Sequence, residues 1–238
     1  MGNGSEPPSG DLHGRRELHE VLGKLPLFEN VFLHMQAVNI SIVDQYIEGL
    51  EEDLLREYLD SDQPPLPKLH FLSAVTQMWV FALYELLRTW KQMVAELLDY
   101  ATALDRIRGK SDFESRKKKL IESRRIKLVR PKPSADLEEA LYWRRFVRIE
   151  RSQSFVKQLQ KAKAAVTPVF LRVERVRVTL AKHEVPRAGR PGRSYAAPYE
   201  RMDTLTGSMR WIIDLSDGTS DFVTRRELAD QCRGTEIA

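Results

Sequence analysis

Apolar residues recur every three or four positions along much of the chain, which is the spacing of one face of an α-helix. This pattern predicts a helix over residues 42–59, begun by Ser41 and Asp44, which resemble a capping box with Asp in place of Glu. Residues 28–38 fit either a helix or a strand, and we favour a helix. The prolines in residues 61–68 predict a turn that ends the first helix, because proline cannot continue the helical hydrogen-bond ladder.

A longer helix is predicted over residues 69–107, where no proline or glycine interrupts the apolar pattern. Its first half is apolar on opposite faces, as Trp79 and Val80 illustrate, so we expect it at the centre of a helical bundle. Glu85 and Arg88 lie one turn apart in this helix, near enough to pair. We expect them to form a buried structural ion pair, because buried charges are normally paired.

The following segment, residues 110–132, is dominated by Lys and Arg and predicts either a short basic helix or a solvated linker. A third long helix is predicted to begin after Ser134 and to end near residue 165. Thr167 and Pro168 then read as a cap followed by a proline at the first helical position, which predicts a separate helix up to about residue 183.

The spacing of apolar residues changes to every second position near the C-terminus, which indicates β-strands. Residues 209–215 alternate in this way, residues 216–218 supply turn chemistry, and residues 221–223 give a return strand. Residues 199–202 are a candidate third strand. Thr224 and Glu227 match a capping box, which predicts a terminal helix.

These elements predict a mainly α fold: a helical bundle with a small C-terminal antiparallel β-hairpin and a short terminal helix, α+β overall. We expect four parts along the chain. They are a disordered tail at residues 1–10, a helical core domain at 11–183, a loop rich in Arg, Gly and Pro at 184–198, and a hairpin-plus-helix subdomain at 199–238.

The single cysteine, Cys232, excludes an internal disulfide framework and a multi-cysteine zinc site, and it fits a reducing compartment such as the cytoplasm. The longest apolar run falls short of the roughly 20 residues that a membrane span needs, so we expect no membrane partner. We see no set of converging metal ligands and no glycine-rich phosphate loop, and we therefore expect neither a metal nor a cofactor.

The formal net charge of +4 is divided unevenly along the chain. Residues 11–62 hold 12 acidic and 4 basic residues, whereas residues 110–132 hold 10 basic and 3 acidic residues. A surface of this kind suits a nucleic-acid backbone, and Trp143 with Tyr142 would be placed to stack on unpaired bases. The candidate nucleic-acid-binding residues are Arg116, Lys117, Lys118, Lys119, Arg124, Arg125, Trp143, Arg144 and Arg145.

Two structural interpretations of the basic residues stay open beside the functional one. They can form a solvated helix face, or they can pair with the acidic face of residues 44–62. The arginines of the predicted loop, Arg187, Arg190 and Arg193, can extend the basic surface or keep the loop soluble.

Arg177 and His183 are weak catalytic candidates, with five residues between them on one predicted helix. A neutral His could act as a general base on a 2′-hydroxyl while Arg steadies the phosphate, which is the chemistry of a metal-free ribonuclease. The structural alternative for His183 is a helix C-terminus, where the helix dipole favours the imidazolium.

We therefore expect a non-catalytic cytoplasmic interaction or regulatory protein with a basic surface, whose partner is a nucleic acid or a protein. One alternative is a metal-independent ribonuclease that uses Arg177 and His183, with Glu85 and Arg88 as further candidates. A second alternative is a scaffold or oligomerisation protein. The sequence leaves the oligomeric state open.

Overall fold

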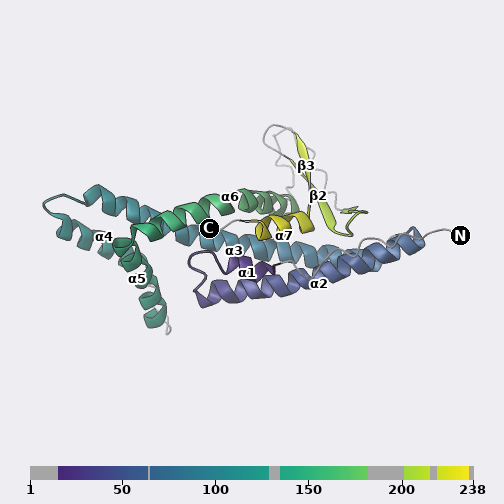
Figure 1. Cartoon of the computed structure of the whole chain (residues 1–238), viewed down its shortest axis with the longest axis horizontal. Helices are drawn as coiled ribbons and strands as arrows, with labels where there is room; N and C mark the ends of the chain where they lie inside the picture. Colours follow the sequence, from purple (N-terminus) through teal and green to yellow (C-terminus); the bar gives the residue numbers. More distant parts are fainter. Residues whose placement is uncertain (1–15, 64, 129–134, 182–200, 215–218, 236–238) are drawn as a thin grey trace, which may run out of the picture. The chain divides into compact units, whose positions relative to one another are not determined.

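The computed structural model describes residues 16–63, 65–128, 135–181, 201–214 and 219–235; within these ranges the side chains of 125–142 and 214 are not described. This part of the chain is mainly helical and carries a small antiparallel sheet near the C-terminus, as the sequence predicted (Figure 1). The predicted tail (1–10) and loop (184–198) lie outside the described residues.

The described helices and strands follow one another from the N-terminus to the C-terminus. They are α1 (Leu18–Leu22), α2 (Val31–Ser61), α3 (Leu66–Ile107), α4 (Phe113–Leu128), α5 (Ala135–Arg151), α6 (Gln153–Ala181), β1 (Arg201–Met202), β2 (Met209–Asp214), β3 (Ser220–Thr224) and α7 (Arg225–Arg233).

The chain divides into two compact units, each with its own internal contacts. The terminal unit combines residues 1–84 with residues 169–236, so the C-terminal sheet and α7 belong with the N-terminal helices. The middle unit consists essentially of residues 85–168. Helices α3 and α6 each contribute residues to both units.

Helix α2 joins the helix favoured for residues 28–38 to the helix predicted for residues 42–59, so the helix preference for the first segment is confirmed and the predicted start at residue 42 is wrong. Asn30 caps it, because the Asn30 Oδ1 accepts hydrogen bonds from the backbone N–H of Phe32 at 2.9 Å and of Leu33 at 3.4 Å. The predicted cap at Ser41 is wrong: Ser41 lies inside the helix, buried, with its hydroxyl 3.3 Å from the His19 Nδ1. The proline-containing turn at the end of α2 is confirmed.

A buried ion-pair cluster joins α2 to α7 in the terminal unit. Arg225 is fully buried and donates from Nε and Nη2 to the two carboxylate oxygens of Glu51, at 2.9 and 2.5 Å. It also donates to Asp44, which is buried and accepts a second bond from Arg233. Arg233 further bonds Glu48 at 3.0 Å. Both oxygens of Asp44 are therefore held by guanidinium groups from opposite ends of α7.

In this cluster three carboxylates on α2 face three guanidinium groups on α7, and Arg233 also pairs with Asp230 of its own helix at 3.2 Å. Arg226 completes the set through a 3.2 Å contact with Glu51. Burial raises the pKa of Asp44, although Arg225 and Arg233 act in the opposite direction. Burial by itself would lower the pKa of Arg225, but the carboxylates of Glu51, Asp44 and Glu48 raise it. The acids sit at i, i+4 and i+7 of α2, so the helix presents them on one face.

The sheet has the order β1-β2-β3 and packs one face inward. On β2, Met209, Trp211 and Ile213 are buried, whereas the intervening residues point outward, which is the alternation that the sequence predicted. Gly207, in the turn before β2, has φ +72°, and a Cβ there would lie 2.1 Å from the Glu51 carbonyl oxygen. The turn therefore approaches α2 closely at a residue of the ion-pair cluster.

The capping box at the start of α7 is confirmed, since the Thr224 hydroxyl accepts from the Glu227 N–H at 3.1 Å and the Glu227 carboxylate accepts from the Thr224 N–H at 2.8 Å. The predicted helix boundary at Thr167 is wrong, because Pro168 lies inside α6. Val166 and Val169 are both buried, and packing of this face outweighs the local cap signal. The break falls instead at Ser152, whose hydroxyl accepts from the Phe155 N–H at 3.2 Å.

The ion-pair cluster gives a stability prediction for Arg225. We expect Arg225→Met to lower the free energy of unfolding by about 3–5 kcal/mol, because it strands the buried carboxylates of Glu51 and Asp44. Glu51→Met alone should also destabilise, and the double variant should lose much less than the sum of the two single losses. Urea unfolding followed by circular dichroism measures all three. Additive losses would contradict a coupled pair.

Cys232 gives a prediction about reactivity and pH. Burial raises the pKa of its thiol to about 12. The thiol should therefore resist a thiol reagent in the native protein and react on unfolding. Since the unfolded thiol ionises near pH 9 and the native one does not, its contribution to stability should fall as the pH rises from 9 to 12. Cys232→Ala, compared with the parent chain over this pH range, isolates that contribution, and a native thiol that reacts quickly would contradict burial.

Candidate nucleic-acid interface

The two units carry opposite net charges. The middle unit, residues 85–168, contains 21 Lys and Arg and 11 Asp and Glu, which is a net charge of +10. The rest of the chain contains 17 basic and 23 acidic residues, a net charge of −6. The modest net charge of the whole chain therefore conceals a strongly basic unit.

Several cations of α4 are engaged inside the middle unit. Arg116 pairs with Asp112 at 2.7 Å, and this contact lowers the pKa of Asp112. Lys117 pairs with Glu150 at 2.6 Å. Some cations of the predicted basic stretch therefore form ion pairs with acids of their own unit. These acids are not the ones at residues 44–62 that the sequence suggested as partners.

Arg124 is placed against aromatic rings rather than in solvent. Its guanidinium carbon lies 5.4 Å from the centroid of the Tyr100 ring and 5.8 Å from that of Phe146. The Tyr100 hydroxyl donates to Glu150 at 2.5 Å. Burial, followed by the hydrogen bond to Glu150 and the charge of that carboxylate, raises the pKa of Tyr100. Arg124 is therefore a packing residue of α4, because cation–π contacts fix its guanidinium against the aromatic rings.

The segment from residue 143 to residue 168 presents almost only positive charge. It contains seven Lys and Arg and one acid, Glu150, whose carboxylate is occupied by Tyr100 and Lys117. Four of its cations are exposed and form no ion pair with any described side chain; they are Arg144, Arg151, Lys157 and Lys161. These four residues are named here the α5–α6 cationic surface.

The predicted nucleic-acid-binding residues divide between exposed and packed positions. Lys118 and Lys119 are exposed on α4, and Arg144 is exposed on α5. Trp143 is only partly exposed, with its ring centroid 5.6 Å from that of Phe146. The side chains of Arg125 and Tyr142 lie outside the described ones, and Arg145 is half-buried.

The sequence interpretation missed Arg151, Lys157 and Lys161. The signal that could have found them is that no acid occurs from residue 151 to residue 168. The basic residues there are spread out, so they do not stand out as a dense basic run.

The structure describes one member of the predicted catalytic pair. Arg177 lies in α6 with its guanidinium carbon 5.2 Å from the centroid of the Tyr84 ring, which in turn stacks on Phe170. His183 lies outside the described residues. The pairing of Arg177 with His183 therefore stays a prediction.

Glu85 and Arg88 form the predicted ion pair, with an Nη2 to Oε2 distance of 2.6 Å. The expectation that the pair is buried is wrong, because the side chains are 50% and 39% exposed. The reason is that α3 is not enclosed on every side. Trp79 and Leu83 are buried, whereas Met78 on another face is 71% exposed.

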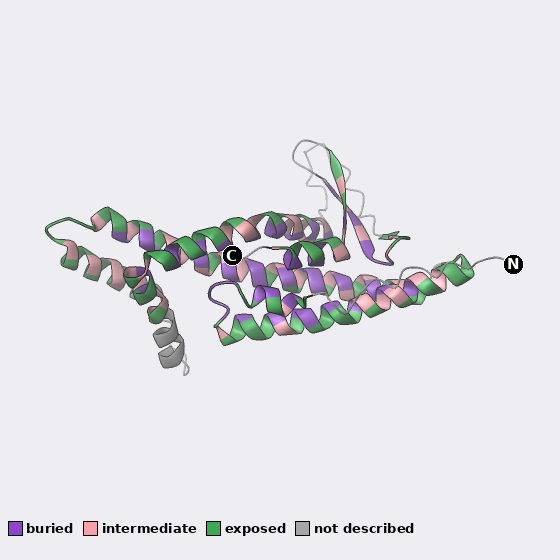
Figure 2. Ribbon diagram, viewed as in Figure 1, coloured by how far each residue is buried: buried purple, intermediate pink, exposed green. Residues whose placement is uncertain are grey.

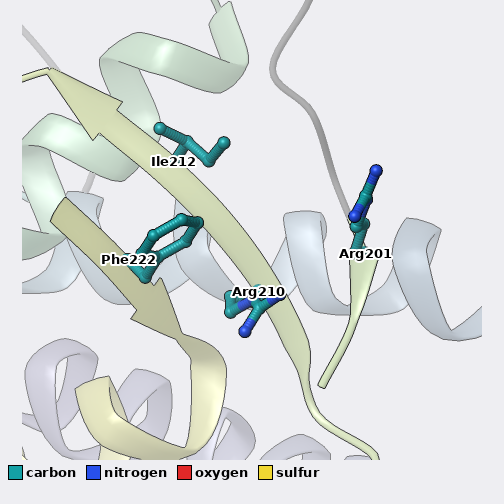
Figure 3. A pocket seen from close by; sticks show the side chains of 4 residues that line it. All are labelled: Arg201, Arg210, Ile212 and Phe222. Atoms are coloured by element: carbon teal, nitrogen blue, oxygen red, sulfur yellow. The ribbon is translucent and has the colours of Figure 1, made fainter. Parts of the chain in front are cut away.

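A separate pocket of about 380 Å³ lies on the outward face of the sheet (Figure 3). Arg201 and Arg210 are direct cross-strand partners, and the Arg210 guanidinium carbon lies 5.0 Å from the centroid of the Phe222 ring. Ile212 completes the lining. The pocket combines positive charge with apolar surface, but its four lining residues include no nucleophile, acid or general base.

Among the described residues, no group of three or more His, Cys, Asp or Glu side chains is arranged to hold a metal ion. No helix in the described ranges is long and apolar enough to cross a membrane. No protein-family model, curated protein or solved structure matches the chain.

The exposure of Arg88 changes the expected effect of removing it. We expect Arg88→Ala to lower the free energy of unfolding by less than about 1 kcal/mol, because an exposed ion pair contributes little. Urea unfolding compares this variant with Arg225→Met, whose arginine is fully buried. Equal losses for the two variants would contradict the difference in burial.

Proposed function

We propose that this protein is a non-catalytic interaction protein whose middle unit binds the phosphate backbone of RNA or DNA. The proposal rests on the α5–α6 cationic surface. Its exposed Lys and Arg form no ion pairs with described side chains, and the one acid between residues 143 and 168, Glu150, faces Tyr100 and Lys117. An unpaired cationic surface attracts a polyanion and releases its condensed counterions on contact.

The chemistry of the surface favours contact with phosphates over reading of bases. Lys157 and Lys161 lie at i and i+4 of α6, so they project from the same side of the helix. Trp143, the aromatic residue expected to stack on bases, instead packs against Phe146. Binding should therefore depend strongly on salt and weakly on base sequence.

A cytoplasmic location belongs to the same proposal. It is supported by the single cysteine, which is buried and unpaired in the terminal unit and fits a reducing compartment.

The test is binding of the purified full chain to labelled RNA and DNA, single-stranded and duplex, across a salt series. We expect affinity to fall steeply as salt rises. Lys157→Gln combined with Lys161→Gln should reduce the slope of log affinity against log salt by about 2, because two phosphate contacts are lost. Recording the integrity of the probe in the same assay tests the ribonuclease alternative.

The matched control is Arg56→Gln combined with Lys68→Gln. It removes the same charge from exposed side chains of the terminal unit, which are 70% and 62% exposed. This control should leave the salt slope near that of the parent chain. No binding at low salt, or equal effects of the two double variants, would refute the proposal. Cleavage of the probe would refute the non-catalytic part and direct attention to Arg177 and His183.

A further inference from the structure

The N-terminal half of α2 exposes an apolar stripe that Asn39 interrupts at its centre. Buried and exposed residues alternate along this helix turn by turn (Figure 2). On the side away from the ion-pair cluster, six large apolar side chains are between 38% and 65% exposed. They form the outer stripe of α2 and are Val31, Phe32, Met35, Ile42, Val43 and Tyr46.

This stripe differs from an ordinary solvated helix face, because it carries no charge. Between residues 31 and 46 the only Asp, Glu, Lys or Arg is Asp44, which is buried in the cluster. The C-terminal half of the same helix exposes Asp53, Arg56 and Asp60. An exposed apolar face of this kind marks an interaction surface.

The two longest segments outside the described residues contain few large apolar residues. The stripe runs over about 22 Å of helix at 1.5 Å per residue. Residues 1–15 contain only Met1 and Leu12 as large apolar residues, and residues 182–200 contain only Val185, Tyr195 and Tyr199. A second copy of the chain, by contrast, brings the same six apolar side chains.

Four of the six residues of the stripe are placed symmetrically about Asn39, an exposed polar residue at its centre; the positions that mirror Val31 and Ile42 are Ile47, which is buried, and Gln36, which is polar. Phe32 and Tyr46 each lie seven residues from Asn39, and Met35 and Val43 each lie four residues from it. A two-fold axis at Asn39 that relates antiparallel helices would therefore bring aromatic residues together at both ends. It would also place Met35 beside Val43, twice.

An amide at the centre suits this symmetry, because Asn both donates and accepts and so can pair with its own copy. A single polar residue within an apolar seam is also a device that fixes register. We propose that the outer stripe of α2 binds a second copy of this chain, with the two α2 helices antiparallel across a two-fold axis at Asn39. The interface is isologous, since each residue pair occurs twice.

The first test is the mass of the protein, without nucleic acid, by sedimentation equilibrium at micromolar concentrations. The parent chain should have twice the monomer mass of 27.5 kDa. Met35→Glu should reduce the mass to that of a monomer, because it places a carboxylate within the apolar seam. Leu59→Glu is the matched control: it introduces the same charge on the same helix at a side chain that is 69% exposed but lies outside the stripe. This control should stay dimeric.

The second test determines the orientation of the helices. Cys232 is buried, and Cys232→Ala removes it as a background thiol. In that background, a mixture of Met35→Cys and Val43→Cys chains should be joined by a short bismaleimide, whereas either variant alone should not. Efficient cross-linking of Met35→Cys to itself would refute the antiparallel arrangement.

Three outcomes would refute the dimer itself. One is a monomeric parent chain, and another is a Leu59→Glu variant that dissociates as Met35→Glu does. The third is a monomer in which Met35→Cys is protected from a thiol reagent, which would show that the chain covers its own stripe. These measurements use no nucleic acid and concern only the terminal unit, so they are independent of the proposed function.

Discussion

The buried ion-pair cluster between α2 and α7 is the interaction on which the terminal unit depends. Arg225 has no contact with solvent, so its guanidinium must be satisfied by the carboxylates of Glu51 and Asp44. Helix α7 is only nine residues long and mostly polar, which gives it little apolar surface with which to hold its place. The hydrogen bonds at its two ends, from Arg225 and Arg233, therefore fix its position relative to α2.

The same chemistry is used in opposite ways in the two units. In the terminal unit, arginines of α7 point inward and neutralise acids that α2 would otherwise bury alone. In the middle unit, Glu150 of α5 points inward, since it accepts from Tyr100 and pairs with Lys117. Because that carboxylate is occupied, it does not pair with the exposed cations of the α5–α6 cationic surface, and this supports the proposed phosphate binding.

Helix α2 uses two opposite faces, and the side chains on the two faces differ in chemistry. One face carries the acids of the cluster together with buried apolar residues such as Ile47 and Leu54. The other carries the outer stripe, which is apolar and uncharged. Because the cluster fixes the rotation of α2 within its unit, it also determines which side chains form the outer stripe. An interaction surface and a buried polar core are thus set by one helical register.

The sequence by itself determined the mainly helical class, the proline turn after α2, the C-terminal hairpin and the capping box at Thr224, because each depends on local spacing and turn chemistry. It also located the basic region, since charge is a property of composition. Only the tertiary structure decided which charges are used internally. Arg225 and Asp44 lie 181 positions apart, and Glu85 is exposed because packing encloses one side of α3 and not the other. Ion pairs and burial of this kind depend on how helices far apart in the sequence pack together, and local sequence patterns do not encode that packing.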